Sequence, residues 1–239
     1  MKFNPEERYV GNFTPNDCTI DFYLRVSSLL TENSVVMDLG AGRASWYTDD
    51  HCATRRLVRN ISRNVKKLVA VDEDPIVLSN RASDEQLLAS NNQIDVDDSY
   101  FDLIVSDFVF EHVKDPIAFV NEVSRVLKPG GWLCARTPHK YSYPAIASML
   151  LANSRHSGIV PIVQPDRKVV DIFPAYYRLN TKRNLNKYFT GWADRTFLYK
   201  VDPAYYFGLG GVFDILNFIH GVTPKFFSGN LLVFLQKPH

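Results

Sequence analysis

Short apolar runs that alternate with helical stretches are the feature that most constrains how this chain can fold. Four such runs are rich in β-branched residues, and polar residues, glycine or proline follow each of them. They are residues 35–39, 68–71, 101–105 and 132–135. Runs of this length and composition are typical of strands buried on both faces of a parallel sheet. The pattern therefore predicts an α/β fold.

The segments between these runs carry helical periodicity. Residues 17–30 and 116–127 place apolar side chains at helical spacing, and the second stretch stops at Pro129-Gly130-Gly131. Strands that alternate with helices build a parallel sheet covered by helices. Later in the chain, Thr181 is predicted to cap a helix that runs through Phe189, and two last strands are expected at 196–201 and 230–235.

The length and organisation of the chain predict that residues 1–239 form a single domain. A chain of 239 residues can bury a sizeable core, and no internal repeat interrupts it. The motifs described below occupy residues 33–138. Aromatic residues, prolines and glycines crowd the remainder, so residues 139–239 are expected to form a cap and the last strands on the same sheet.

Composition narrows the protein class. The chain is 46% hydrophobic and 22% charged, as ordinary globular proteins are. Lys and Arg number 27 against 26 Asp and Glu, so overall charge gives no reason to expect nucleic acid as a partner. Three dispersed cysteines without a CxxC pair argue against disulfides and a cysteine zinc site. With no apolar leader or spanning run, a cytoplasmic, soluble protein is expected.

The segment 35–43 carries the most chemical information. An apolar strand runs into Asp38 and then into the turn Gly40-Ala41-Gly42. Glycines let the backbone approach a ligand, and the free N–H groups of a following helix attract a carboxylate or phosphate. The GxGxxG pattern of nicotinamide dinucleotide enzymes is not met, because position 45 is Ser. A carboxylate at position 38 suits a cationic ligand better than a pyrophosphate.

A second acidic motif follows the next strand, where residues 68–71 lead into Asp72-Glu73-Asp74-Pro75. A carboxylate at the tip of the second strand of such a fold can accept hydrogen bonds from both ribose hydroxyls. Asp72 is predicted to take that role. Asp74 is better placed to cap a helix that starts at Pro75, so both functions fit in one segment.

Two further motifs complete an ordered series. Residues 101–107 lead into Glu111-His112 and Asp115-Pro116, and residues 125–133 form the fourth motif. Together the four motifs, over residues 33–138, resemble the class I S-adenosylmethionine (SAM)-dependent methyltransferases, especially the group that includes small-molecule and quinone-biosynthesis enzymes. The resemblance implies a Rossmann-like three-layer sandwich whose seven-stranded sheet has six parallel strands and an antiparallel last strand. It also implies SAM as the cofactor and S-adenosylhomocysteine (SAH) as the product.

The resemblance assigns roles to particular residues. Asp38 and the turn Gly40-Ala41-Gly42 would line the methionine part of SAM, and Asp72, with Glu73 beside it, would bind the ribose. Ser106 and Asp107 would border the transferred methyl group. The family usually has an acidic residue that recognises adenine, and here Ser90-Asn91 occupies that place. The usual third glycine of the first motif is Ala44.

Three side chains are candidates for a catalytic base, which a hydroxyl acceptor would need. Asp107, His112 and His139 all follow the ends of predicted strands, where the cleft of such folds opens. Glu111-His112 is also similar to the ExxEH pattern of metal-dependent methyltransferases, but Phe108 stands at the first position and cannot ligate. No metal is therefore expected.

The stretch between Gly42 and Asp72 is longer than is usual in the family, and basic residues dominate it. No acidic residue occurs between His51 and Ala70. Apolar residues recur at helical spacing there, so a basic amphipathic helix is predicted. A solvated basic face is the favoured interpretation, and a dock for an anionic substrate or a membrane surface is the alternative. These basic residues are Arg55, Arg56, Arg59, Arg63, Lys66 and Lys67.

These observations favour a SAM-dependent methyltransferase that acts on an oxygen of a small-molecule, glycan or lipid- or carrier-linked metabolite. N- or C-methylation is a second hypothesis, and a non-catalytic SAM-binding scaffold is a third. Residues 203–222 are nearly free of charged side chains. Burial as a lid over the cleft is the favoured interpretation of that segment, and a homodimer surface or a peripheral membrane contact remain as alternatives.

Overall fold

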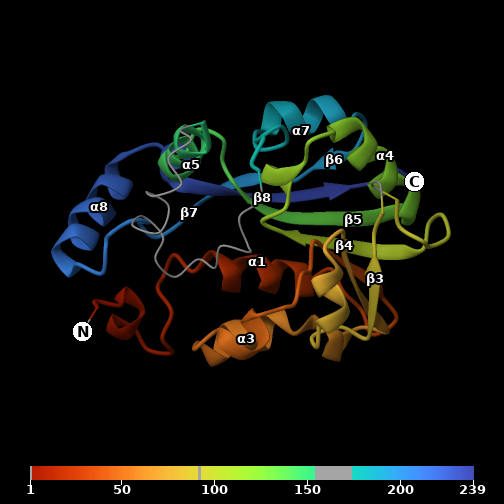
Figure 1. The fold of residues 1–239 in the computed structure, drawn as a ribbon, viewed down its shortest axis with the longest axis horizontal. Helices are drawn as coiled ribbons and strands as arrows, with labels where there is room; N and C mark the ends of the chain where they lie inside the picture. The colour runs from red at the N-terminus through yellow and green to blue at the C-terminus, as the bar shows by residue number, and fades with distance from the viewer. Residues whose placement is uncertain (1, 91–92, 154–173) are drawn as a thin grey trace.

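A twisted eight-stranded sheet forms the centre of the computed structural model, which describes residues 2–90, 93–153 and 174–239 (Figure 1). The order across the sheet is β3-β2-β1-β4-β5-β8-β6, and β7 also pairs with β8. The strands are β1 (Val35–Leu39), β2 (Lys67–Asp72), β3 (Glu85–Leu88), β4 (Phe101–Asp107), β5 (Leu127–Pro138), β6 (Ala193–Asp194), β7 (Phe197–Lys200) and β8 (Gly229–Gln236).

The strand directions confirm the expected architecture. Strands β1 to β5 are parallel, and β8 runs antiparallel to β5. β6 and β7 both pair antiparallel with β8 in one continuous register, in which Ala193 lies opposite Gln236 and Phe197 opposite Leu232. They therefore act as one strand, interrupted between Asp194 and Phe197, so that the eight strands correspond to the seven that were predicted.

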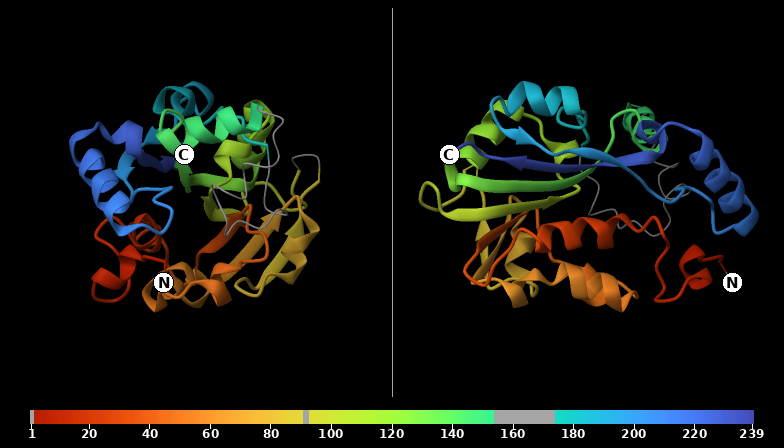
Figure 2. Two further views of the ribbon diagram at one scale, coloured as in Figure 1. Left: turned by 60° about the vertical axis from the view of Figure 1, so that its left-hand side comes forward. Right: turned by 180° about the vertical axis from the view of Figure 1, so that it is seen from behind.

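Helices cover both faces of this sheet (Figures 1 and 2). α1 (Cys18–Ser27) and α3 (Ala53–Arg59) lie on one face, and α4 (Pro116–Val126) and α7 (Lys182–Tyr188) lie on the other. α5 (Tyr143–Asn153) and α8 (Gly210–Val222) lie toward the end of the molecule that also holds the chain's N-terminus. The short helices α2 (Trp46–Asp49) and α9 (Lys225–Ser228) complete the set of described α-helices.

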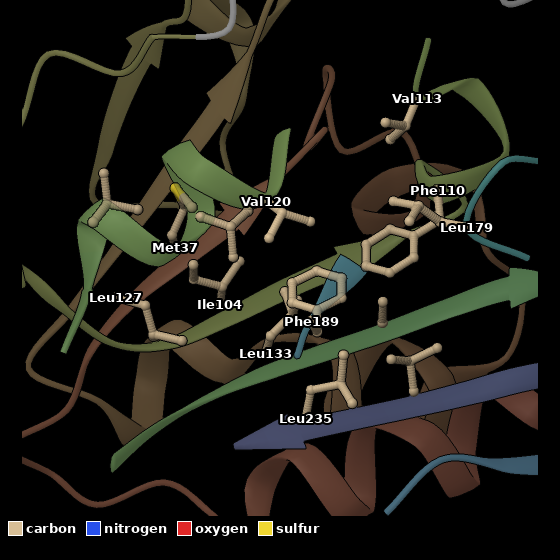
Figure 3. Close-up of a cluster of buried hydrophobic side chains, with 14 of the residues drawn as sticks. Met37, Ile104, Phe110, Val113, Val120, Leu127, Leu133, Leu179, Phe189 and Leu235 are labelled. Atoms are coloured by element: carbon tan, nitrogen blue, oxygen red, sulfur yellow. The ribbon is translucent and has the colours of Figure 1, made fainter. Parts of the chain in front are cut away.

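Alternation of side chains along the central strands divides the core in two. Successive strand residues point to opposite faces of a sheet. Met37 and Ile104 accordingly join the cluster beneath α4 and α7, which Figure 3 shows. Val36 and Leu103 join the second cluster, with Phe22 of α1. Because both faces are buried, the central strands are apolar on both sides, which is why they appear in the sequence as short continuous runs.

Side-chain caps set the starts of the helices. The Asp17 carboxylate accepts hydrogen bonds from the backbone N–H groups of Thr19 and Ile20 at 3.0 Å each, at the start of α1. The Thr181 hydroxyl accepts from the N–H of Asn184 at 3.2 Å, as the predicted cap of α7 requires. Each cap satisfies N–H groups that the first helical turn leaves unpaired.

The basic stretch does not form the single amphipathic helix that was predicted. α3 ends at Arg59, Asn60 interrupts the helix, and a separate 3-10 turn follows at Ile61–Asn64. Leu57, one of the apolar residues that recur at helical spacing in this stretch, is 64% exposed. The favoured solvated basic face is also wrong for Arg55, whose guanidinium binds carboxylates of three other segments. These are Glu6 at 2.6 Å, Asp17 at 2.9 Å and Asp50 at 2.9 Å.

α8 likewise differs from the buried lid that was favoured. Phe213 and His220 are buried, but Ile215, Phe218 and Val222 are 64%, 72% and 70% exposed. The helix therefore buries one face and turns a largely apolar face outward. None of the helices in the described ranges combines the length and apolar character needed to cross a bilayer.

Arg55 is expected to hold the N-terminal segment and α1 against α3. Replacing Arg55 by Met leaves three carboxylates without their common partner, so we expect a loss of about 3 kcal/mol in the free energy of unfolding. Arg63→Met on the same stretch is the control, because Arg63 is exposed, and its effect should stay within about 0.5 kcal/mol. Urea denaturation of both variants measures the difference, and equal losses would contradict the anchoring role.

Candidate functional site

The turn after β1 is tied to the end of β2. The backbone N–H groups of Gly40 and Ala41 donate to the carbonyl oxygen of Val71 at 2.7 and 3.2 Å. Gly42 donates its N–H to Oδ2 of Asp72 at 2.9 Å, and the Asn80 side chain donates to the Gly42 carbonyl at 3.0 Å. These bonds fix the turn between the first two strands.

The backbone of this turn explains its residue types. Gly40 has φ +75°, and a Cβ atom there would lie 2.2 Å from Cγ2 of Val109, so no side chain fits. Gly42 has φ +49°, and a Cβ there would meet nothing within 4 Å, so its backbone faces open space. Ala44 also has a positive φ, +51°, at the position where the family usually has glycine.

Of the two neighbouring carboxylates Asp72 and Asp74, Asp74 takes the capping role that the sequence predicts, and the ribose role of Asp72 stays a prediction. Asp72 is half-buried at the end of β2, and its Oδ1 accepts the N–H of Asp74 at 2.9 Å. Each carboxylate oxygen of Asp72 has one protein donor and a second lone pair for a ligand. Asp74 accepts the N–H of Ile76 at 2.9 Å and caps the 3-10 turn Pro75–Ser79. Glu73 is exposed beside them.

The segment expected to face adenine begins beside Asp72. Ala89 donates its N–H to the carbonyl of Asp72 at 2.8 Å, which brings the end of β3 to the end of β2. Ser90 follows, exposed and paired through its backbone with Gln93 at 3.0 and 2.9 Å. Asn91 lies outside the described residues.

Asp38 is the carboxyl group with the most unusual environment in this site. Burial raises its pKa to about 7, and the nearby carboxylates of Asp107 and Asp72 act in the same direction. The Arg59 guanidinium opposes this shift without cancelling it. Near neutral pH, Asp38 is therefore poised between its charged and neutral forms, and a cation placed against it would favour the charged form.

Asp107 has the opposite environment at the end of β4. Arg136 lies opposite it in the register of β4 and β5, and its Nε and Nη2 atoms donate to the two carboxylate oxygens at 2.7 Å each. Arg59 adds a third contact at 3.3 Å. Burial by itself would raise the pKa of Asp107, but the two guanidinium groups bring it below its usual value. Asp107 is thus a permanent anion and a weak base.

The remaining predicted side chains are Ser106, His112 and His139, which lie at or just beyond the ends of β4 and β5. Ser106 is fully buried, and its hydroxyl has no hydrogen-bond partner among the described residues. Nδ1 of His112 lies 2.9 Å from the carbonyl of Pro174. Nδ1 of His139 lies 3.1 Å from the carbonyl of Phe226, and burial lowers the pKa of this imidazole.

The two arginines of the site were not predicted to be part of it. Arg136 follows the strand 132–135 directly, so its position opposite Asp107 could have been inferred from pairing the ends of neighbouring strands. Arg59 stacks against Tyr23 and Trp46, with its guanidinium carbon 5.4 and 4.7 Å from their ring centroids. The sequence gives no sign of these contacts, because the aromatic partners lie in other segments.

Comparison with known proteins shows similarity to methyltransferases. Residues 51–135 match the family model described as a methyltransferase domain. A dimethylglycine N-methyltransferase of Parasynechococcus marenigrum is 34% identical over 125 residues, which are 49% of this chain and 42% of that relative. The chain thus matches less than half the length of that relative.

Solved structures share the fold over nearly the whole chain. The putative methyltransferase in complex with the Haloferax volcanii Trm112 activator aligns with a TM-score of 0.59 and 16% identity, covering 93% of this chain and 91% of that one. A SAM-dependent methyltransferase from Aquifex aeolicus aligns with a TM-score of 0.51 and 15% identity, covering 93% of each chain. The chain has the fold of SAM-dependent methyltransferases, and its residues 51–135 match a methyltransferase domain. The matched domain and the fold imply SAM as the cofactor.

The side chains of this methyltransferase domain fit that cofactor. SAM carries a sulfonium and an ammonium group. Asp38 offers a carboxyl group whose ionised form a nearby cation would stabilise. The open space at Gly42 leaves room for a ligand against the backbone, and Asp72 keeps lone pairs for ribose hydroxyls. The donor set thus agrees with both the charge and the hydrogen-bonding groups of SAM.

Proposed function

We propose that this chain transfers a methyl group from SAM to an oxygen atom of a small-molecule or carrier-linked acceptor. The observation that carries this proposal is an arrangement at the ends of β1 and β2, where Asp38 precedes the glycine turn and Gly42 donates its N–H to Asp72 at 2.9 Å. This order suits a nucleoside with a charged amino-acid tail. Burial raises the pKa of Asp38 to about 7, which makes this carboxyl group responsive to a cation.

In this proposal each part of the cofactor has its own protein partners. Asp38 holds the cationic end, and the turn Gly40-Ala41-Gly42 passes along the methionine part. Asp72 accepts the ribose hydroxyls, with Glu73 next to it at the solvent edge. Ser90 borders the adenine, and Ser106 and Asp107 border the reacting methyl group. When bound, SAM supplies an electrophilic methyl group on a positively charged sulfur.

The protein's contribution is mainly positioning. Displacement at a methyl carbon needs the nucleophile and the sulfur in line, and exclusion of water assists it. Asp107 is bound by two guanidinium groups and is a poor proton acceptor. Of the three predicted candidates we favour His139 as the base, because burial lowers its pKa and keeps the imidazole neutral near pH 7; its Nδ1 lies 3.1 Å from the carbonyl of Phe226 and 3.3 Å from the N–H of Tyr141. Nδ1 of His112 lies 2.9 Å from the carbonyl of Pro174, to which it donates.

N-methylation is the second candidate function. It is favoured by the likeness to the dimethylglycine N-methyltransferase, whose name states that it methylates a nitrogen. A free amine is already nucleophilic when neutral, so this reaction needs less from a base. The weak basicity of Asp107 is compatible with it.

Product formation tests the proposed function. The purified chain is incubated with SAM and with separate pools of small polar metabolites, glycans and lipid extracts, and SAH is quantified. We expect SAH to form with one pool and the new methyl group to be found on oxygen. Methyl transfer to nitrogen would establish the second candidate. Binding of SAM without SAH formation in any pool would instead support a non-catalytic scaffold.

Two neighbouring carboxylates provide a matched test of cofactor binding. Asp72→Ala should weaken SAM binding by roughly 1 to 3 kcal/mol, because the ribose hydroxyls lose a buried acceptor. Asp74→Ala removes the same charge from the same turn but only a helix cap, so SAM affinity should stay near that of the unaltered chain. Calorimetric titration with SAM and SAH measures both, and an unchanged affinity in Asp72→Ala would contradict the ribose assignment.

A further inference from the structure

A cavity of about 190 Å³ lies beyond the ends of β4 and β5. Phe108 directly follows β4, Pro138 ends β5, and Asn230 lies at the start of β8, and all three line it. Because β1 and β2 lie on the other side of β4 in the sheet, this cavity and the glycine turn flank the tip of β4 from opposite sides. The cavity therefore adjoins the place where the proposed function puts the methyl group.

His220 of α8 lines this cavity and carries a buried polar atom, Nε2, that has no hydrogen-bond partner among the described residues. The residue is 3% exposed and lines the cavity wall. Its Nδ1 lies 3.1 Å from the carbonyl oxygen of Val201, so Nδ1 carries the proton and donates it. Its Nε2 is buried and has no hydrogen-bond partner among the described residues. Burial also lowers the pKa of the ring, so the imidazole is neutral and Nε2 presents a lone pair.

Two of the other polar side chains that line the cavity, those of Tyr143 and Asp202, already have hydrogen-bond partners within the protein. The hydroxyl of Tyr143 donates to the carbonyl of Ala204 at 3.0 Å and accepts the N–H of the same residue at 2.7 Å. The Asp202 carboxylate accepts hydrogen bonds from the side chains of Thr14 and Asn16. Tyr143 and Asp202 therefore already have hydrogen-bond partners in the protein, whereas Nε2 of His220 lacks a hydrogen-bond donor among the described residues.

We propose that this cavity binds the acceptor substrate as a compact, ring-sized apolar group whose hydroxyl donates a hydrogen bond to Nε2 of His220. An apolar cavity of about 150 Å³ accommodates a benzene molecule, so about 190 Å³ accommodates one substituted ring. Phe108, Pro138, Pro144 and Val201 supply apolar walls. A site with a buried hydrogen-bond acceptor binds a ligand that donates a hydrogen bond to it more tightly than a ligand of equal shape that has no donor.

This inference deepens the proposed function and rests on it for the identity of the ligand as the methyl acceptor. It makes His220 a residue that determines specificity for the acceptor. The substrate class it names is phenols and cyclic alcohols, either free or at the end of a larger carrier.

Phenol and toluene are the test probes, because they differ only in an O–H against a methyl group. Their dissociation constants are measured on the full chain without added cofactor, and SAM binding is titrated separately. Failure to bind SAM or to form SAH would then count against the proposed function, while the probe result would still decide the cavity.

Two variants separate the two nitrogen atoms of His220. His220→Asn keeps an N–H near the Nδ1 position, which can still donate to Val201, and removes the acceptor at Nε2. His220→Gln places an amide oxygen near the Nε2 position and so keeps an acceptor. We expect the preference for phenol over toluene to fall about tenfold in His220→Asn, as the loss of about 1.4 kcal/mol implies, and to be largely kept in His220→Gln.

The unaltered chain provides a readout that does not depend on the folding of variants. The ¹⁵N resonance of His220 Nε2 should move when phenol is added and should move much less with toluene. Three results would overturn the proposal: neither probe binds in the cavity, the Nε2 resonance responds equally to both, or His220→Asn folds and keeps the full preference for phenol.

Discussion

The ion pair between Asp107 and Arg136 is the interaction on which the rest of the site depends. It joins the ends of two neighbouring parallel strands, with both partners in register and two hydrogen bonds of 2.7 Å. A buried carboxylate without its partner is costly, so the two strand ends are held as a unit. Arg136 also donates to Thr19 at 2.6 Å, and Arg59 contacts Asp107, so α1 and α3 converge on the same pair.

This arrangement makes the two carboxyl groups of the site chemically different. Asp107 is neutralised by guanidinium groups and has a lowered pKa. Asp38 is half-buried near the same charges, but no arginine lies at hydrogen-bonding distance from it in the described structure, and its pKa is about 7. When the environments of two neighbouring carboxyl groups separate their pKa values, the two groups can perform different tasks. Asp107 organises the strand ends, and Asp38 is left to respond to a ligand's positive charge.

The sequence predicts those parts of the site that are local along the chain. Asp38 lies near the end of an apolar run, and the glycine turn and Asp72 each follow such a run directly, so their positions at one edge of the sheet could be inferred from strand pairing alone. β3 was not located, because the run Glu85-Gln86-Leu87-Leu88 is half-buried at the edge of the sheet and lacks β-branched residues. The main strands were located because they are buried on both faces.

Interactions between distant segments account for what the sequence did not predict. Arg55 binds the carboxylates of Glu6 and Asp17, which lie 49 and 38 residues away in the sequence. No local sequence pattern indicates that a basic residue is buried. His220 is similar, since its role follows from the fold of α8 against residues near Val201. The exposed face of α8 was misjudged as buried because apolar composition alone does not say which face of a helix has a partner.

The most direct test of this account is an NMR titration of the Asp38 carboxyl carbon, first in the free protein and then in the presence of saturating SAM. The account predicts a pKa of about 7 in the free protein and a clear decrease with SAM bound, because the ligand's cation stabilises the carboxylate. By linkage, SAM affinity should then rise as the pH increases toward 7 and level off above it. An ordinary pKa near 4 in the free protein, or a value that SAM does not change, would contradict the central claim.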